Sequence, residues 1–228
     1  MNLHPIEVIP LTPTTAYLAG AIIGDGHISN AKKSKNAVSH RISIQVADRD
    51  YAELILKKIK ELVLTTTTIK VCQRPNRQPL YTVSVTNKSL YHFLVYSLRI
   101  PAGAKSRSVV VPERVKLASD EIKQCFLAGI FDTDGGKRGG TIGLTSASLK
   151  LVCDIQDLLL QFDILSTFDV WWNRKYERFY YGLRLRRQSI DTFLRNVPFL
   201  DFAKFLPFAA MPEWPNGLEN DHASFGQA

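Results

Sequence analysis

Two hydrophobic patterns divide the chain into strands and helices. Residues 41–46 and 80–86 alternate between apolar and polar side chains, as half-buried β-strands do. Between residues 50 and 63 the apolar positions instead recur every three or four residues, which predicts an amphipathic helix that begins at Asp48 or Asp50. Because both patterns recur along the chain, we expect an α+β protein.

The same order of elements occurs twice. Ser89 and Phe93 overlay Ser189 and Phe193 at a spacing of 100 residues, which implies a pseudo-twofold molecule of two αββαββα repeats. The first repeat should contain helices ending near residues 24, 63 and 98, the first capped by Thr14 or Thr15 and the third by Ser89. Its strands should be 27–29, 41–46, 68–73 and 80–86. The second should contain helices 120–133, 148–162 and 189–196 and strands near 140–145, 167–174 and 178–187. We assign residues 1–100 and 120–205 to the repeats, 101–119 to a linker, and 206–228 to a tail held by Phe208 and Trp214.

A nine-residue segment near the start of each repeat carries an acid in an unusual place. Residues 18–26 read LAGAIIGDG and residues 127–135 read LAGIFDTDG, so Asp25 and Asp134 lie 109 residues apart. An anion at a helix C-terminus costs about 0.3–1 kcal/mol because the unpaired carbonyls there are negative. We expect the glycine after each acid to adopt the left-handed conformation that ends many helices.

Small residues on one face of each segment indicate what offsets this cost. Gly20 and Gly24 are four residues apart, and Gly129 and Thr133 repeat the spacing, so the two helices could pack closely side by side. Their packing would bring two carboxylates and two negative helix ends to one point, which attracts a divalent cation through hard oxygen ligands. One such segment alone would be more simply a buried core helix, but the repetition favours a metal site.

The two segments resemble the motif of the LAGLIDADG family of homing endonucleases and their relatives. This resemblance implies that Asp25 and Asp134 bind the catalytic metal, and that the backbone carbonyls of Gly24 and Thr133 also contact it. It implies motif helices packed at the centre and two antiparallel sheets that form a DNA-binding saddle. The first copy departs from the motif at Ile23, where the second keeps an acid, but that position is not a metal ligand in the family.

The resemblance also implies a shell of polar and basic residues that orders water around the metal. The candidates by position are Gln45, Lys105, Lys137 and Lys204, although an exposed lysine in a basic protein often only adds charge. We expect Mg²⁺ as the cofactor, with Mn²⁺ able to substitute and Ca²⁺ binding without supporting cleavage. Two further polar residues are more simply explained: we expect Asp48 to be a helix N-cap and His27 to be a surface side chain.

The charge balance favours a polyanionic partner. The chain has 228 residues, with 29 Lys and Arg against 21 Asp and Glu, a net charge of +8 and a pI near 9.4. Trp171 and Trp172 should point to opposite faces of their strand, one into the core and the other free to contact nucleic acid. By strand alternation and by position at turns and strand ends, the residues expected to contact duplex DNA are Lys32, Lys33, Lys35, Arg41, Ser43, Gln45, Lys70, Arg74, Arg77, Thr82, Ser84, Arg138, Trp172, Arg174, Lys175, Arg178, Arg184 and Arg186.

Other protein classes receive little support from the sequence. Cys72, Cys125 and Cys153 are too few and too far apart for a disulfide framework or a zinc cluster, and we expect buried thiols. No secretory leader is evident at the N-terminus, and no apolar run reaches membrane-spanning length. We expect a soluble, intracellular monomer, free-standing and intron-encoded, that does not bind membranes.

Together these observations predict a site-specific, divalent-metal-dependent DNA endonuclease that makes a double-strand break in a long pseudo-palindromic target. The resemblance implies a staggered cut across the minor groove, with one strand assigned to each acid. An RNA-binding maturase that assists splicing of its own intron is the chief alternative. A catalytically silent DNA-binding regulator is a third, less favoured because both acids are retained and no helix-turn-helix segment is evident.

Overall fold

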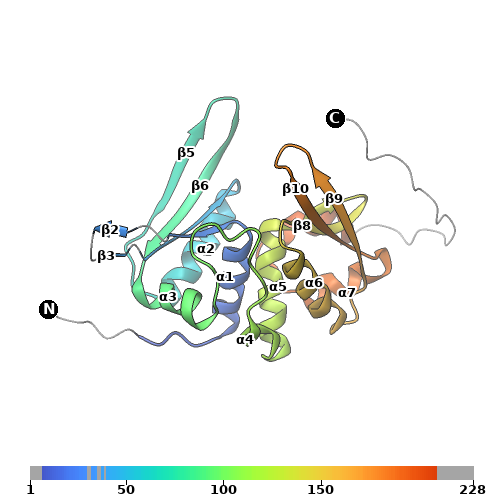
Figure 1. Cartoon of the computed structure of the whole chain (residues 1–228), viewed down its shortest axis with the longest axis horizontal. Coiled ribbons are helices and arrows are strands. Elements are labelled where there is room, and N and C mark those ends of the chain that lie inside the picture. Colours follow the sequence, from blue (N-terminus) through green and yellow to red (C-terminus); the bar gives the residue numbers. More distant parts are fainter. Residues whose placement is uncertain (1–6, 30–31, 35–36, 39, 210–228) are drawn as a thin grey trace.

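The computed structural model describes residues 7–29, 32–34, 37–38 and 40–209, and within them the two predicted repeats are present (Figure 1). The first repeat consists of α1 (Pro13–Gly24), β1 (Gly26–Ile28), β4 (Arg41–Val46), α2 (Arg49–Leu62), β5 (Ile69–Arg74), β6 (Arg77–Thr86) and α3 (Lys88–His92), which continues as a π-helical turn (Phe93–Ser97). The second consists of α5 (Asp120–Asp134), β7 (Gly136–Arg138), β8 (Thr141–Ser146), α6 (Leu149–Leu160), β9 (Ser166–Asn173), β10 (Arg178–Leu185) and α7 (Ile190–Asn196).

Other elements lie within the first repeat, between the repeats or after the second. A short hairpin of β2 (Lys32–Ser34) and β3 (Ala37–Val38) lies between β1 and β4. The first repeat is nine residues longer there, because the motif acids are 109 residues apart whereas later residues of the repeats are 100 apart. The helix α4 (Glu113–Lys116) lies in the segment predicted as a linker. A 3-10 turn (Phe202–Phe205) and α8 (Leu206–Ala209) follow α7, and Phe208 is buried there. Trp214, the other residue expected to hold the tail, is outside the described residues.

Each repeat forms one four-stranded antiparallel sheet, and the two sheets have the same connectivity. Their strand orders are β1-β4-β6-β5 and β7-β8-β10-β9, so equivalent strands occupy equivalent places. Figure 1 shows the hairpins β5–β6 and β9–β10 standing apart above the central helices. The predicted α+β fold with two related halves is therefore confirmed.

The helix α1 begins one turn earlier than the predicted caps require. Thr12 is its N-cap, and Thr15 completes a capping box by accepting from the Thr12 backbone N–H at 2.7 Å. Similarly, α3 is capped by Asn87 rather than Ser89, whose hydroxyl instead accepts from the backbone N–H of Glu7. Asp48 caps α2 as expected. Where several polar residues precede a helix, the sequence identified the right region but not the right cap.

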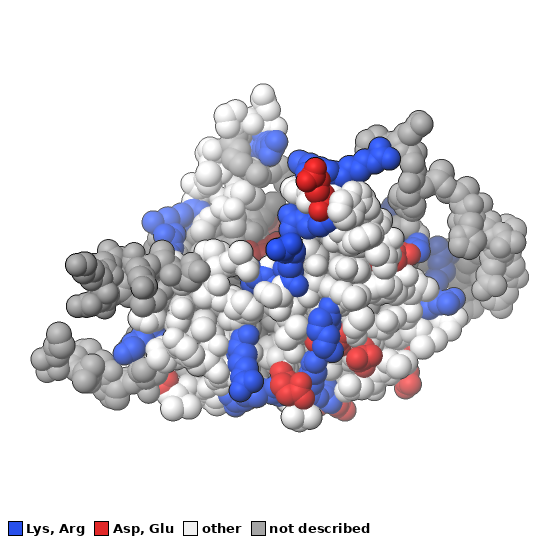
Figure 2. Space-filling model, viewed as in Figure 1, with Lys and Arg blue, Asp and Glu red and all other residues white. Residues whose placement is uncertain are grey.

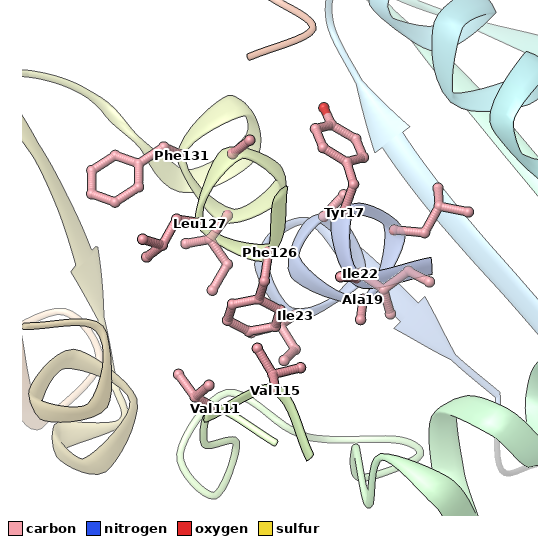
Figure 3. Packing of buried hydrophobic residues seen from close by; sticks show 14 of the residues in the cluster. Tyr17, Ala19, Ile22, Ile23, Val111, Val115, Phe126, Leu127 and Phe131 are labelled. Atoms are coloured by element: carbon pink, nitrogen blue, oxygen red, sulfur yellow. The ribbon is translucent and has the colours of Figure 1, made fainter. Parts of the chain in front are cut away.

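The motif helices α1 and α5 pack side by side and in the same direction at the centre of the molecule (Figure 3). A Cβ atom on Gly20 would lie 2.2 Å from the carbonyl oxygen of Phe126, and one on Gly129 would lie 2.0 Å from that of Tyr17. Real Cβ atoms do not approach so closely, so only glycine allows this helix separation. Buried side chains of both helices then continue into one core with Val111 and Val115, close to Phe126 and Ile23 in Figure 3.

The glycines after the two acids serve a different purpose from the predicted one. Neither Gly26 nor Gly135 has a positive φ angle, and that of Gly135 is −75°. Instead, a Cβ on Gly26 would lie 2.5 Å from Cα of Ile22, and one on Gly135 would lie 2.4 Å from the carbonyl oxygen of Phe131. The prediction of left-handed caps is wrong: each glycine lets the chain fold back tightly against the last turn of its helix.

Two expectations from composition have different outcomes. Cys72 is exposed, so the expectation of buried thiols is wrong for that residue, whereas Cys125 and Cys153 are half-buried. The register of β5 places Cys72 on the same face as Lys70, opposite to the face of the buried Val83, which explains its exposure. Among the described residues, no helix is long and apolar enough to cross a membrane.

Candidate metal and nucleic-acid site

The two motif acids lie where the C-terminal ends of α1 and α5 meet. Asp25 directly follows α1, and Asp134 is the last residue of α5. A Cβ on Gly24 would lie 2.1 Å from Oγ1 of Thr133 and 3.4 Å from Cγ of Asp134. Gly24 therefore brings the end of one helix against the acid of the other, and the small residues place both carboxylates at one junction.

Electrostatics at this junction penalises two negative charges. Both side chains reach solvent, yet the protein atoms crowded around them raise the pKa of each carboxyl. Desolvation is the main cause for Asp134, whose pKa is raised to about 6, and the charge of Asp25 raises it further. The nearby ammonium groups of Lys105 and Lys204 act in the opposite direction. A cation bound between the acids would favour their ionised form.

Two lysines neutralise the negative helix ends. The Lys105 ammonium donates to the carbonyl oxygens of Ile23 at 2.7 Å and Gly24 at 3.1 Å. The Lys204 ammonium donates to the carbonyl oxygens of Asp132 at 3.0 Å and of Phe131 and Thr133 at 3.3 Å. Burial lowers the pKa of both lysines, and the acids partly offset this. The lysines therefore occupy equivalent places beside the acid pair, as their positions in the two repeats predict.

The oxygen donors at the junction fit a divalent cation of the magnesium type. Two carboxylates and the carbonyls of Gly24 and Thr133 are hard ligands, which Mg²⁺ prefers. The described residues contain no cluster of three or more His, Cys, Asp or Glu, so most remaining ligands of such an ion would be water or substrate oxygens. In this structure the carbonyl oxygens of Gly24 and Thr133 accept hydrogen bonds from the two lysine ammonium groups. Their use by a cation would require those ammonium groups to move.

The other two catalytic candidates have different places. Gln45 lies on the polar face of the first sheet, where its amide donates to the Thr82 hydroxyl at 3.0 Å. Its counterpart in the second repeat is Thr145, whose buried hydroxyl has no hydrogen-bond partner. Lys137 pairs with Ile142 and therefore lies on the opposite face of β7 from Arg138. The register thus places Gln45 on the polar side and Lys137 on the other.

Both sheets present a polar face, and half of the residues expected to contact DNA lie on it. In the first sheet, register puts Arg41, Ser43, Gln45, Lys70, Thr82 and Ser84 on one face, and Arg41 donates to the Ser84 hydroxyl at 2.7 Å. In the second sheet, Arg184 shares a face with Arg178 and binds Asp169 through two hydrogen bonds of 2.7 and 3.0 Å. Figure 2 shows basic side chains on both lobes and down the middle of this side of the molecule.

Several of the expected DNA contacts lie elsewhere. Arg77, Arg174 and Lys175 are exposed at the hairpin turns, and Arg186 is exposed just after β10. Trp172 pairs with Phe179 on the side of Leu183 and Leu185, whereas Trp171 shares the face of Arg184. Lys35 and the side chains of Lys32, Lys33 and Arg74 are outside the described part of the structure.

A buried polar network beside the acids was missed in the sequence. The Tyr17 hydroxyl donates to Asp132 at 2.6 Å and lies 2.9 Å from the Tyr51 hydroxyl, while the Leu200 backbone N–H donates to Asp132 at 2.9 Å. Burial raises the pKa of Asp132 to about 6 and also raises that of Tyr17. The retained motif acid Asp132 thus anchors the segment that carries Lys204. A tyrosine within an otherwise apolar helix was the available signal.

The paired motif helices and the duplicated sheets are similar to those of solved LAGLIDADG homing endonucleases. The sequence model of the LAGLIDADG-like domain family matches residues 121–198, most of the second repeat. The structure of the homing endonuclease I-DmoI in complex with DNA and Mn superposes with a TM-score of 0.63 and 20% identity, covering 82% of this chain and 97% of that one. The DNA-bound homing endonuclease I-WcaI superposes with a TM-score of 0.61 and 16% identity, covering 90% and 96%. The LAGLIDADG resemblance indicated by the two motifs is confirmed.

Curated relatives match through small parts of long proteins. The replication factor C small subunit of Methanocaldococcus jannaschii is 29% identical over 182 residues, which is 79% of this chain but 9% of that protein. Across three such relatives the chain spans 9–26% of their length. Other I-DmoI complexes with DNA were determined with Mg or Ca.

Proposed function

We propose that this chain is a site-specific DNA endonuclease of the homing type that makes a double-strand break and depends on a divalent cation. The observation that carries the proposal is the junction of α1 and α5, where Asp25 and Asp134 meet between two sheets with polar and basic faces. Mg²⁺ is the cofactor we propose, held by the two carboxylates with the carbonyl oxygens of Gly24 and Thr133. We propose that Mn²⁺ can replace it and that Ca²⁺ supports binding without cleavage.

Phosphodiester hydrolysis needs an activated water, neutralisation of the phosphate and stabilisation of the leaving oxygen, all of which a bound divalent cation supplies. The chain's own residues place and balance this chemistry. Lys105 and Lys204 keep the helix ends neutral and put positive charge beside the acids. Gln45, held by Thr82, offers an amide near the polar strands that could orient water. The second repeat has Thr145 at the position of Gln45, so the two halves differ at this point.

The two sheets together are large enough to contact a long DNA target. Each presents strand residues that can reach base edges in a major groove, with arginines at the ends for phosphates. One chain supplies both halves, so a monomer suffices for a pseudo-palindromic site. The matches to small parts of proteins with unrelated names support a module that is inserted into other genes.

The proposal is tested with a library of randomised duplexes incubated with the purified protein. We expect one selected sequence to be cut on both strands in Mg²⁺ and to remain whole in EDTA. A protein that assists intron splicing would leave every duplex whole and bind the intron RNA instead. A silent regulator would select a sequence but leave it intact in Mg²⁺. Either of these last two outcomes would contradict the proposal.

A further inference from the structure

The polar face of the second sheet carries a row of aromatic rings without a counterpart in the described part of the first. Trp171 and Tyr180 pair across β9 and β10 on the face of Arg184, with ring centres 6.2 Å apart and planes 22° apart. Tyr176, at the hairpin turn, continues the row with its ring centre 6.2 Å from that of Tyr180. At the equivalent positions of the first sheet the pair is Cys72 and Leu80, and serine, threonine and lysine lie on the rest of this face of β5 and β6.

Arginines cover the faces of these rings. Arg138 lies over Trp171 at 5.9 Å, and Arg178 lies over both Tyr176 at 5.2 Å and Tyr180 at 5.7 Å. Gly182 leaves space on the sheet for the Trp171 ring, because a Cβ at Gly182 would lie 3.0 Å from that ring. With guanidinium groups and a neighbouring ring already against the π faces, unpaired bases have little ring surface on which to stack. The ring edges remain for contact.

Duplex DNA offers one apolar group to a side chain in the major groove, the C5 methyl of thymine. Hydrogen-bonding side chains read the other base edges, and the first sheet has such side chains. We propose that Trp171 and Tyr180 read thymine methyl groups in the half-site bound by the second repeat, whereas the shorter side chains of Cys72 and Leu80 leave the first repeat to read its half-site through the hydrogen bonds of its other strand residues. This inference rests on the proposed function, because it assumes that the polar faces bind duplex DNA.

The proposal is tested by removing methyl groups from the DNA rather than atoms from the protein. In the selected target, each thymine is replaced singly by deoxyuridine, and the Kd of the wild-type chain is measured in Ca²⁺. A buried methyl contributes about 0.8 kcal/mol, so each contacted thymine should raise Kd about fourfold when its methyl is lost. We expect these increases in the second half-site and changes below about 1.5-fold in the first.

The half-sites are assigned with a DNA-cleaving reagent attached to single cysteines. Cys72, exposed on the first sheet, reports the first half, and Glu177→Cys in a Cys72→Ser background reports the second from its exposed hairpin turn. Cys72→Ser alone controls for cleavage from the half-buried cysteines. A selected second half-site without thymine would overturn the inference before any substitution is made.

Two protein variants then locate the effect. The double variant Trp171→Ala with Tyr180→Ala should abolish the deoxyuridine penalty, while Trp172→Ala, on the opposite face, should retain it; thermal unfolding verifies that both remain folded. Because the penalty compares two duplexes on one protein, a general loss of stability does not imitate it. Equal penalties in both half-sites, no penalty, or a penalty that survives the removal of both Trp171 and Tyr180 would each overturn the inference. Failure to select or cut any duplex would instead overturn the proposed function.

Discussion

The two repeats differ most where they face the proposed substrate and least where they face each other. At their contact, Gly20 and Gly129 play equivalent parts, and Lys105 and Lys204 cap equivalent helix ends. On the sheets, by contrast, Ser84 of one repeat corresponds to Arg184 of the other, and the pair Cys72 and Leu80 corresponds to Trp171 and Tyr180. A contact on a pseudo-twofold axis constrains both copies together, whereas each sheet face is free to change separately. The duplication therefore preserves a shared centre while allowing an asymmetric target.

The largest effect is expected from the acids of that shared centre. Asp25→Asn or Asp134→Asn should each lower double-strand cleavage by about 1,000-fold, because each removes a negative metal ligand, while DNA binding changes little. Single-turnover cleavage on a target labelled on both strands measures the two cuts separately. A difference between the strands affected by the two variants would show which acid serves which strand. Full double-strand activity in either variant would remove that residue from the site.

The contact between the repeats should be the most sensitive place for stability. Gly129→Ala puts a methyl group 2.0 Å from the carbonyl oxygen of Tyr17, so the helices must separate. We expect a loss of about 3 kcal/mol in the free energy of unfolding, measured with denaturant. Gly136→Ala is the matched control, because a Cβ there would make only an ordinary van der Waals contact of 4.0 Å with the Lys204 side chain. Equal losses in the two variants would contradict the close helix contact.

The buried network tests how the second motif differs from the first. Tyr17→Phe removes a hydrogen bond to Asp132 and should lower the free energy of unfolding by about 1–3 kcal/mol. Tyr51→Phe removes only the bond between the two hydroxyls and should cost less. The first repeat has Ile23 at the position of Asp132 and needs no such partner. A smaller loss for Tyr17→Phe than for Tyr51→Phe would contradict this assignment.

A pH titration should show the cost of bringing the two acids together. The pKa of Asp134 is about 6 in the folded protein, above its ordinary value of 3.8, so proton binding favours the folded state. The corresponding stabilisation is complete below pH 3.8 and is lost as pH rises through 6. Relative to Asp134→Asn, the metal-free wild-type chain should therefore lose stability across this window, measured by thermal unfolding. Mg²⁺ at pH 7 should restore part of the difference, and a difference independent of pH would contradict the shift.

The smallest effect is expected from single phosphate contacts on the sheet faces. Arg186→Gln should weaken DNA binding for all sequences alike and reduce the slope of log Kd against log salt by about 0.9. Arg184→Gln should act similarly but less simply, because Arg184 is already bound to Asp169. An unchanged slope for both would place these arginines off the DNA interface.

Periodicity and repetition predicted most of the architecture. The acids, the two lysines and the polar strand faces all followed from positions that recur in both halves, because a duplicated fold places duplicated residues alike. Features specific to one half were harder to predict. The network of Tyr17 joins two repeats through residues distant in sequence, and the face of Trp171 depends on a register that alternation alone leaves open. Likewise, the close packing of Gly26 and Gly135 could not be predicted, because it depends on how tightly the chain folds back against the last turn of each helix.

The most direct test of the shared centre is anomalous diffraction from crystals of the protein with its selected duplex and Mn²⁺. The account predicts manganese at the junction of α1 and α5, coordinated by the carboxylates of Asp25 and Asp134. Manganese bound only elsewhere, with neither carboxylate among its ligands, would contradict it.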